Sequence, residues 1–190
     1  MENVKKKSGA LSARDLVLCA LFASLIAAGA FIKIPVPLVP FTLQFLFTNL
    51  AGVLLGKKRG LISVLLYIFI GLAGIPVFTQ GGGPAYVLQP TFGYILGMAL
   101  GTWLAGLITE RGAGSMKTYL IAGAVNLVVV YVIGMIYFYF IKDFYLGTPI
   151  SISNLLIYCC LVFVPGDGLS FVLGAVIAKR LKPRLLLAQN

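Results

Sequence analysis

Apolar runs separated by short polar connections fill most of this chain. A helix needs about 20 apolar residues to cross the hydrocarbon layer of a membrane, with about 17 as a lower limit. Six runs are candidates for such helices: 15–33, 41–56, 60–73, 91–109, 118–141 and 154–178. The pattern predicts an all-α membrane protein, in which a bundle of six transmembrane helices forms a single integral membrane domain over residues 1–190.

The second and third runs are short, and the segment that follows them is unusual. Residues 74–90 carry no charged side chain, but they include three prolines and the triplet Gly81-Gly82-Gly83. Glycine lets the backbone approach a ligand closely, and short segments interrupted by Gly or Pro mark the binding sites of many transporters. We therefore expect this loop, between the third and fourth helices, to cap a small-molecule site. A long surface connection is the alternative.

The composition excludes an ordinary soluble domain. Hydrophobic residues make up 60% of the chain, charged residues 11%, and the mean hydropathy is +1.03. Soluble domains carry about a quarter charged residues. The net charge of +10 comes from clusters between the apolar runs, which indicates contact with membrane lipid and not with nucleic acid.

The same basic residues predict the orientation. Six spans would place 13 of the 15 Lys and Arg residues on one side and leave Lys33 and Lys142 on the other. By the positive-inside rule the larger group faces the cytoplasm, so we expect a multi-pass protein of the cell membrane. Both termini, with short basic tails of about 1–13 and 180–190, would be cytoplasmic, and the glycine-rich loop would face outward. The cytoplasmic group comprises Lys5, Lys6, Lys7, Arg14, Lys57, Lys58, Arg59, Arg111, Lys117, Lys179, Arg180, Lys182 and Arg184.

The chain lacks the residues of a catalytic or cofactor site. It contains no histidine, and its three cysteines lie inside apolar runs without a metal-binding spacing. Residues 112–118 imitate a phosphate loop, but Arg111 and Met116 replace two glycines that the motif requires. Because a nucleophile–base pair is also missing, we expect neither an enzyme nor a bound cofactor.

One acidic residue, Asp167, lies inside an apolar run. It is about 12 residues from Lys179, so at about 1.5 Å per residue it lies near the middle of the bilayer. It follows Pro165-Gly166, which predicts a kinked or broken helix beside it. Because an intramembrane carboxylate is costly, we expect Asp167 to face the bundle interior and to bind a ligand; a hydrogen-bonded acid that stabilises the kink is the alternative.

Further candidate ligand residues are polar or aromatic side chains near the glycine-rich loop and within the spans, together with two glycines of the loop whose backbone amides could contact a ligand. For each buried amide, a hydrogen bond between helices is an equal alternative to ligand contact. The two outward lysines, Lys33 and Lys142, would attract a ligand carboxylate or extend to lipid headgroups. The candidates are Thr42, Gln44, Phe78, Gln80, Gly82, Gly83, Tyr86, Gln89 and Asn126.

The first span carries small residues at helical spacing. Such a face allows another helix to approach closely, either within the bundle or from a partner subunit. The face comprises Ala20, Ala23, Ser24, Ala27 and Ala28.

These motifs together resemble the BioY-type biotin-binding S components of energy-coupling factor (ECF) transporters. The resemblance lies in segments 39–44, 71–78, 81–83, 90–97 and 165–167, which follow one another in order along nearly the whole chain. It departs from the family pattern at Gln89 and Phe92, where glycines are usual, and at Ser170, where many relatives have a lysine.

The resemblance implies a substrate-capture subunit for vitamin uptake. Biotin would be the transported ligand, bound in an outward-facing intramembrane pocket closed by the loop between the third and fourth helices. Members of the family have no ATPase activity of their own and work with a coupling transmembrane subunit and two ATP-binding cassette ATPases. Ala23 and Ala27 match the Ala-x-x-x-Ala surface that S components offer to the coupling subunit. A self-sufficient, proton-coupled carrier of biotin or a similar solute is the alternative function.

Overall fold

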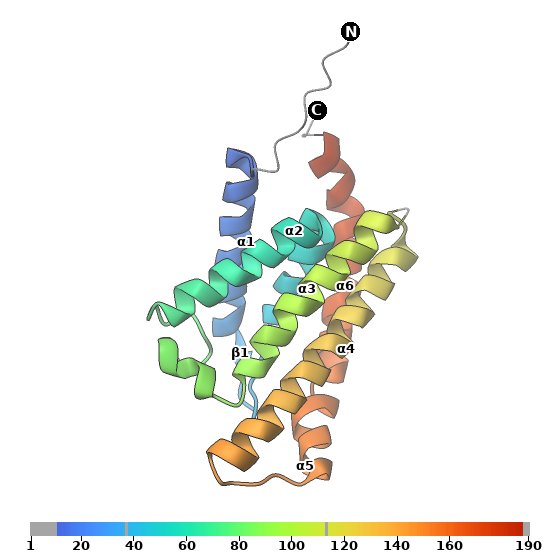
Figure 1. The fold of residues 1–190 in the computed structure, drawn as a ribbon. Coiled ribbons are helices and arrows are strands. Elements are labelled where there is room, and N and C mark those ends of the chain that lie inside the picture. The colour runs from blue at the N-terminus through green and yellow to red at the C-terminus, as the bar shows by residue number, and fades with distance from the viewer. Residues whose placement is uncertain (1–10, 37, 113, 188–190) are drawn as a thin grey trace.

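The computed structural model describes residues 11–36, 38–112 and 114–187, with side chains up to position 183. Lys5, Lys6 and Lys7, most of the predicted N-terminal tail, and the side chain of Arg184 therefore lie outside the described part. Five long helices dominate the fold (Figure 1): α1 (Ala13–Phe31), α2 (Gln44–Leu72), α3 (Phe92–Arg111), α4 (Met116–Phe140) and α6 (Val164–Leu187).

Shorter elements connect these helices. Two-residue strands β1 and β2 pair in antiparallel register between α1 and α2. The chain from α4 to α6 contains two π-helical turns and one short α-helix. The short elements are β1 (Lys33–Ile34), β2 (Phe41–Thr42), η1 (Pro84–Leu88), η2 (Ile141–Tyr145), α5 (Ile152–Leu156) and η3 (Ile157–Leu161).

The predicted all-α membrane class is confirmed. Four helical units in the described part of the chain are long and apolar enough to cross a membrane: Ala13–Phe31, Phe92–Arg111, Met116–Tyr145 and Ile152–Pro183. The predicted runs 41–56 and 60–73 lie largely within one element, α2, which is kinked at Gly56; Phe41 and Thr42 belong to β2 instead. The predicted count of six is therefore not confirmed by the described helices.

A kink at Gly56 explains this difference. Its φ of 83° and ψ of 177° interrupt the helical path, and only glycine adopts this conformation readily. The second half of α2 starts at Lys57, whose backbone N–H donates to Glu110 Oε1 at 2.8 Å. The ammonium of Lys57 lies 3.3 Å from the other carboxylate oxygen. A side chain from α3 thus caps the helix where the sequence pattern predicts a connection.

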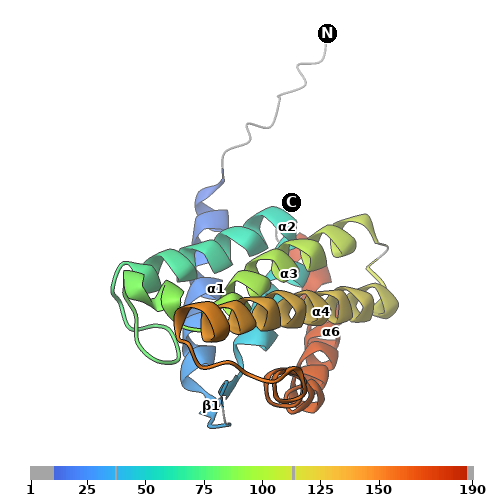
Figure 2. The ribbon, with the colours of Figure 1, turned by 60° about the horizontal axis from the view of Figure 1, so that its bottom comes forward.

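The helices form a layered bundle. Figures 1 and 2 show α3 between α2 and α4, while α6 contacts α2 and α4 and α1 contacts α2. Glycines make the contact of α3 with α4 close: a Cβ added at Gly97 would lie 2.8 Å from Val130 Cα. This close packing leaves little space between the two helices.

The two ends of the bundle differ in charge. The start of α1, the kink of α2 and the end of α6 lie at one end (Figure 1). There Arg59 pairs with Asp15 at 2.8 Å, which links α2 to α1. Lys33 lies at the opposite end, beside the loop that contains η1, and its Nζ donates to the carbonyl of Thr79 at 2.9 Å. The described basic residues therefore separate toward the two ends as the sequence predicts.

Candidate ligand-binding site

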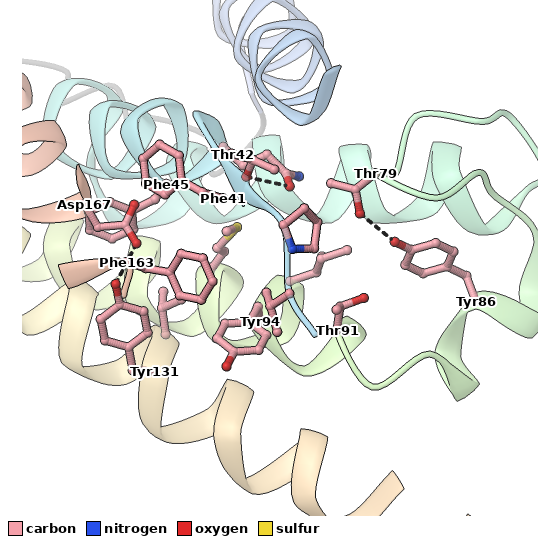
Figure 3. Close-up of a pocket in the computed structure, with 16 residues that line it drawn as sticks. Phe41, Thr42, Phe45, Thr79, Tyr86, Thr91, Tyr94, Tyr131, Phe163 and Asp167 are labelled. Carbon is pink, nitrogen blue, oxygen red and sulfur yellow. Dashed lines mark hydrogen bonds between the residues drawn. The ribbon is translucent and has the colours of Figure 1, made fainter. Parts of the chain in front are cut away.

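A cavity opens among α2, α3, α4, α6 and the β1–β2 hairpin. Its empty volume is about 590 Å³, counting the space open to solvent. Of the predicted ligand residues, it brings together Thr42, Gln44, Tyr86 and Asp167. Figure 3 shows that the labelled side chains fall into an acidic end, an aromatic middle and a hydroxyl-rich end.

Asp167 forms the acidic end. It lies in the first turn of α6, is 8% exposed, and accepts a hydrogen bond from Tyr131 Oη of α4 at 2.7 Å. A carboxylate accepts several hydrogen bonds, so a ligand donor can bind beside Tyr131. Asp167 faces the bundle interior, as expected because exposure of a carboxylate to lipid costs free energy.

The predicted break in the sixth span lies just before Asp167. The π-helical turn η3 ends at Leu161 and α6 begins at Val164, so Pro165 occupies the first turn of α6, where its missing N–H costs nothing. The π-turn leaves the carbonyl of Cys159 to accept a hydrogen bond from Tyr94 Oη at 2.7 Å. Tyr94 lines the cavity, so the break positions both an acid and an aromatic wall.

Aromatic rings form the middle of the cavity. Phe41 and Phe163 stack with ring centroids 6.3 Å apart and an interplanar angle of 9°. A Cβ at Gly166 would lie 2.7 Å from the Phe41 ring, so glycine at this position makes room for that stack. Phe45 and Tyr94 complete the apolar walls (Figure 3).

Hydroxyl groups gather at the other end, beside the loop of residues 74–90. Thr79 Oγ1 and Tyr86 Oη are hydrogen-bonded at 3.1 Å. Thr91 Oγ1 is buried and has no hydrogen-bond partner among the described residues. This end of the cavity can therefore donate hydrogen bonds to an acceptor on a ligand.

Gln44 connects the cavity to the loop. Its Oε1 accepts from Thr42 Oγ1 at 3.2 Å, and its Nε2 donates to Tyr67 Oη at 2.7 Å. Tyr67 Oη in turn donates to the carbonyl of Val77 at 3.2 Å. The network couples the position of β2 to that of the segment after α2.

Six predicted ligand residues do not line the cavity: Phe78, Gln80, Gly82, Gly83, Gln89 and Asn126. Phe78 is 1% exposed and packs behind Tyr86, with ring centroids 4.4 Å apart. The backbone of Gly83 donates to the carbonyl of Gly71 at 2.7 Å, so it fixes the loop to the end of α2.

Asn126 has the role of an amide between helices. It is fully buried, and its Nδ2 donates to Asn49 Oδ1 of α2 at 3.3 Å. The structure therefore favours the helix–helix alternative that the sequence left open for this residue.

Sequence reasoning did not select several residues that line the cavity. Tyr131 lies in an otherwise aliphatic run of the sequence. Its hydroxyl is a polar group among apolar side chains, and this is the signal that could have marked Tyr131 as a candidate. Thr91 lies within segment 90–97, which carries the family resemblance but is not among the predicted ligand residues. Thr79 lies next to Gln80, so the prediction in the loop was one position away.

The small-residue face of α1 is divided between the core and the surface. Ala23 is 3% exposed within the main core cluster, and Ala27 packs against that cluster. Ala20 and Ser24 are exposed. Ala23 is thus not accessible to a partner in this structure, whereas Ala20 and Ser24 are.

Apolar helices of membrane-spanning length define a multi-pass membrane protein, and the cavity among them, with its acidic end, is the candidate site for a small solute. The sequence model of the BioY family matches residues 3–186. The chain therefore belongs to the BioY family.

Relatives and a solved structure agree with this membership. The chain is 44% identical over 171 residues to a probable biotin transporter BioY of Lysinibacillus sphaericus, covering 90% of this chain and 87% of the relative. It is 38% identical over 170 residues to the biotin transporter BioY of Thermotoga maritima, covering 89% and 96%. It also resembles the crystal structure of the S component for biotin from an ECF-type ABC transporter, with a TM-score of 0.68, 30% identity, and coverage of 92% and 95%.

Proposed function

We propose that this protein captures biotin for uptake and delivers it through an ATP-driven ECF complex. The observation that carries the proposal is the cavity, in which a buried carboxylate lies at one end of an aromatic slot. The ureido ring of biotin offers two N–H donors, and its thiophane ring and valerate chain are apolar. Asp167 would accept from the ureido group, and the rings of Phe41, Phe45 and Tyr94 would contact the apolar part.

The names of the relatives support this ligand, since they are biotin transporters and not enzymes. The name of the structural relative supports a role as an S component. On that basis the partners would be a coupling transmembrane subunit and two ATP-binding cassette ATPases. The ATPases would supply the energy, because the chain has no phosphate loop of its own.

Six membrane segments are part of the proposal. The two halves of α2, 44–55 and 57–72, would be the second and third segments, with the polar kink at Gly56 near the cytoplasmic surface. The basic end of the bundle, with both termini, would face the cytoplasm, and the cavity mouth would face outward. The loop of residues 74–90 would cap the bound ligand through Thr79 and Tyr86, while backbone hydrogen bonds of Gly83 and Gln89 would hold the loop in place and Gln80 and Gly82 would lie beside the ligand site.

We further propose the exposed side of α1 as the docking surface for the coupling subunit. Ala20 and Ser24 are small and exposed, which allows a second helix to approach closely. Ala27 lies at the edge of this surface, and Ala23 supports it from inside the core.

The test of the proposed function is calorimetric titration of the detergent-purified chain with biotin. We expect saturable binding with one biotin per chain. Absence of binding by a folded, monodisperse protein would contradict the proposal.

The buried acid Asp167 also favours a second candidate, a self-sufficient carrier that couples uptake to protons. Uptake by the purified chain alone in liposomes, abolished when the proton gradient collapses, would support this candidate. Uptake that requires the coupling subunit and ATPases would support the first.

A further inference from the structure

A second hollow lies at the basic end of the bundle, away from the cavity that contains Asp167. The kink of α2, the turn between α3 and α4 and the end of α6 border it, and Figure 1 shows these segments at one end of the bundle. Its empty volume is about 1170 Å³, counting the space open to solvent. Lys182, in its wall, lies 15 positions after Asp167 on α6, which is about 22 Å along the helix axis. The hollow is therefore a separate site.

The charged residues in the wall of this hollow leave one cation without a counter-charge. Glu110 lines the hollow, but its carboxylate is paired with the ammonium of Lys57 at 3.3 Å. Arg59 lines it too and is paired with Asp15 at 2.8 Å. Lys182, by contrast, forms no ion pair among the described residues. An ammonium has three donors and no acceptor, so Lys182 has capacity for an anionic ligand.

Tyr119 of α4 positions this lysine and adds a donor of its own. The Nζ of Lys182 lies 5.6 Å from the centroid of the Tyr119 ring, a cation–π distance that orders a long side chain before a ligand binds. Tyr119 is 3% exposed, and its hydroxyl, beside the lining residue Gly114, has no hydrogen-bond partner among the described residues. Because a buried hydroxyl normally has a partner, this one indicates a ligand in the hollow.

The turn before α4 lies in the same wall. Gly112 and Gly114 line the hollow, and α4 begins at Met116 and is 25 residues long. The N-terminus of a long helix carries a partial positive charge, which favours a negative group beside it. Segment 112–118 lacks two glycines of a phosphate loop, but it still borders a place where an anion is favoured.

We infer that this hollow binds the phosphate headgroup of an anionic phospholipid. Lys182 pairs with the phosphodiester, and the Tyr119 hydroxyl donates to one of its oxygens. The apolar lining residues Leu54, Leu55 and Pro183 contact the glycerol and the start of the acyl chains, which a soluble phosphate lacks. Basic pockets between helices at the membrane surface are a known type of site for anionic headgroups. The inference goes beyond biotin capture and does not depend on it.

The test is native mass spectrometry of the detergent-purified chain, titrated with one lipid at a time. The probes are dioleoylphosphatidylglycerol, which is anionic, dioleoylphosphatidylcholine, which is zwitterionic, and sn-glycerol 3-phosphate, which has no acyl chains. The variants are Lys182→Gln and Tyr119→Phe, and the second removes only a hydroxyl without a described partner, so it keeps the fold. Lys179→Gln is the matched control, because Lys179 is exposed on the same helix and does not line the hollow.

The wild type is expected to bind the anionic lipid more tightly than the zwitterionic one. Lys182→Gln should weaken the anionic lipid about fivefold, the effect of one basic residue at an anionic surface, and should leave the zwitterionic lipid unchanged. Tyr119→Phe should weaken the anionic lipid about tenfold, because a hydrogen bond to a charged group is lost. Lys179→Gln should bind both lipids like the wild type.

Weaker binding of the anionic lipid by both variants, with Lys179→Gln like the wild type, supports the inference. Equal effects of Lys182→Gln and Lys179→Gln, or equal affinities of the wild type for the two lipids, overturn it. Binding of sn-glycerol 3-phosphate as tightly as the anionic lipid also overturns it, because the site would then take a soluble phosphate. Titration of the same proteins with biotin tests the proposed function separately, so the two failures are distinguishable.

Discussion

Tyr131 Oη and Asp167 Oδ2 lie 2.7 Å apart, and this hydrogen bond joins α4 to α6 at the acidic end of the cavity. Both residues are buried, at 6% and 8% exposure. The bond therefore stabilises a carboxyl group that is buried away from solvent. The remaining acceptor sites of Asp167 are available to a ligand in the cavity.

Replacing Tyr131 with Phe removes this donor while keeping the ring. We expect the free energy of unfolding to fall by about 1–3 kcal/mol, since a buried charged group loses a partner, and biotin affinity to fall several-fold because Asp167 is less well positioned. Thermal unfolding in detergent and calorimetric titration measure the two effects. Tyr139→Phe, on the same helix but outside the cavity, is the control. Wild-type stability and affinity in Tyr131→Phe would contradict this role.

The kink of α2 predicts a glycine requirement at position 56. Alanine in that backbone conformation costs about 1–3 kcal/mol, and the added Cβ also meets the carboxylate of Glu110. Gly56→Ala should therefore lower the unfolding temperature clearly. Gly168→Ala is the control, because no described atom lies within 4 Å of its added Cβ. Equal unfolding temperatures for the two variants would contradict this prediction, because they would show that position 56 accepts a Cβ without a cost in stability.

Glu110 predicts a difference between two substitutions. Glu110→Gln keeps an oxygen that can accept from the Lys57 backbone and loses only a half-exposed ion pair, worth about 1 kcal/mol or less. Glu110→Ala also loses the helix cap, which costs about 0.5–2 kcal/mol more. Chemical or thermal unfolding of both variants checks the order. A Glu110→Gln protein as unstable as Glu110→Ala would assign the effect to charge and not to capping.

The divided face of α1 predicts opposite behaviour for two alanines. Ala20→Leu enlarges an exposed position, so it should prevent co-purification with the coupling subunit while leaving biotin affinity unchanged. Ala23→Leu overfills the core and should destabilise the chain itself by about 1–3 kcal/mol. If Ala20→Leu retains its partner subunit at wild-type levels, another surface mediates docking.

Periodicity and length predicted the membrane helices well, but they did not predict the path of α2. The charged residues 57–59 indicate a connection between two spans, but only Gly56 leaves the helical path, and a helical segment starts again at Lys57, where Glu110, 53 positions away in the chain, caps it. A tertiary contact of this kind has no local sequence signal. The β1–β2 pair was missed for a related reason, since two residues per strand carry no periodicity.

The site was predicted in part, and the reasons differ between residues. Asp167 is recognisable because a carboxylate inside an apolar run is costly. Thr42, Gln44 and Tyr86 also line the cavity, whereas Asn126 binds Asn49 instead. Tyr131 was overlooked because a tyrosine in a long apolar helix is usually an ordinary core residue. Only the packing of α4 against α6 brings its hydroxyl to the acid.

The most direct test of the account is the affinity of Asp167→Asn for biotin, measured by calorimetry on the purified chain. Asparagine has nearly the same shape and lacks the charge, and Asp143→Asn, at an acid outside the cavity, is the control. We predict stoichiometric binding by the wild type and by the control, and a loss of about tenfold or more in Asp167→Asn. A folded Asp167→Asn protein that binds biotin with wild-type affinity would contradict the assignment of this cavity as the biotin site.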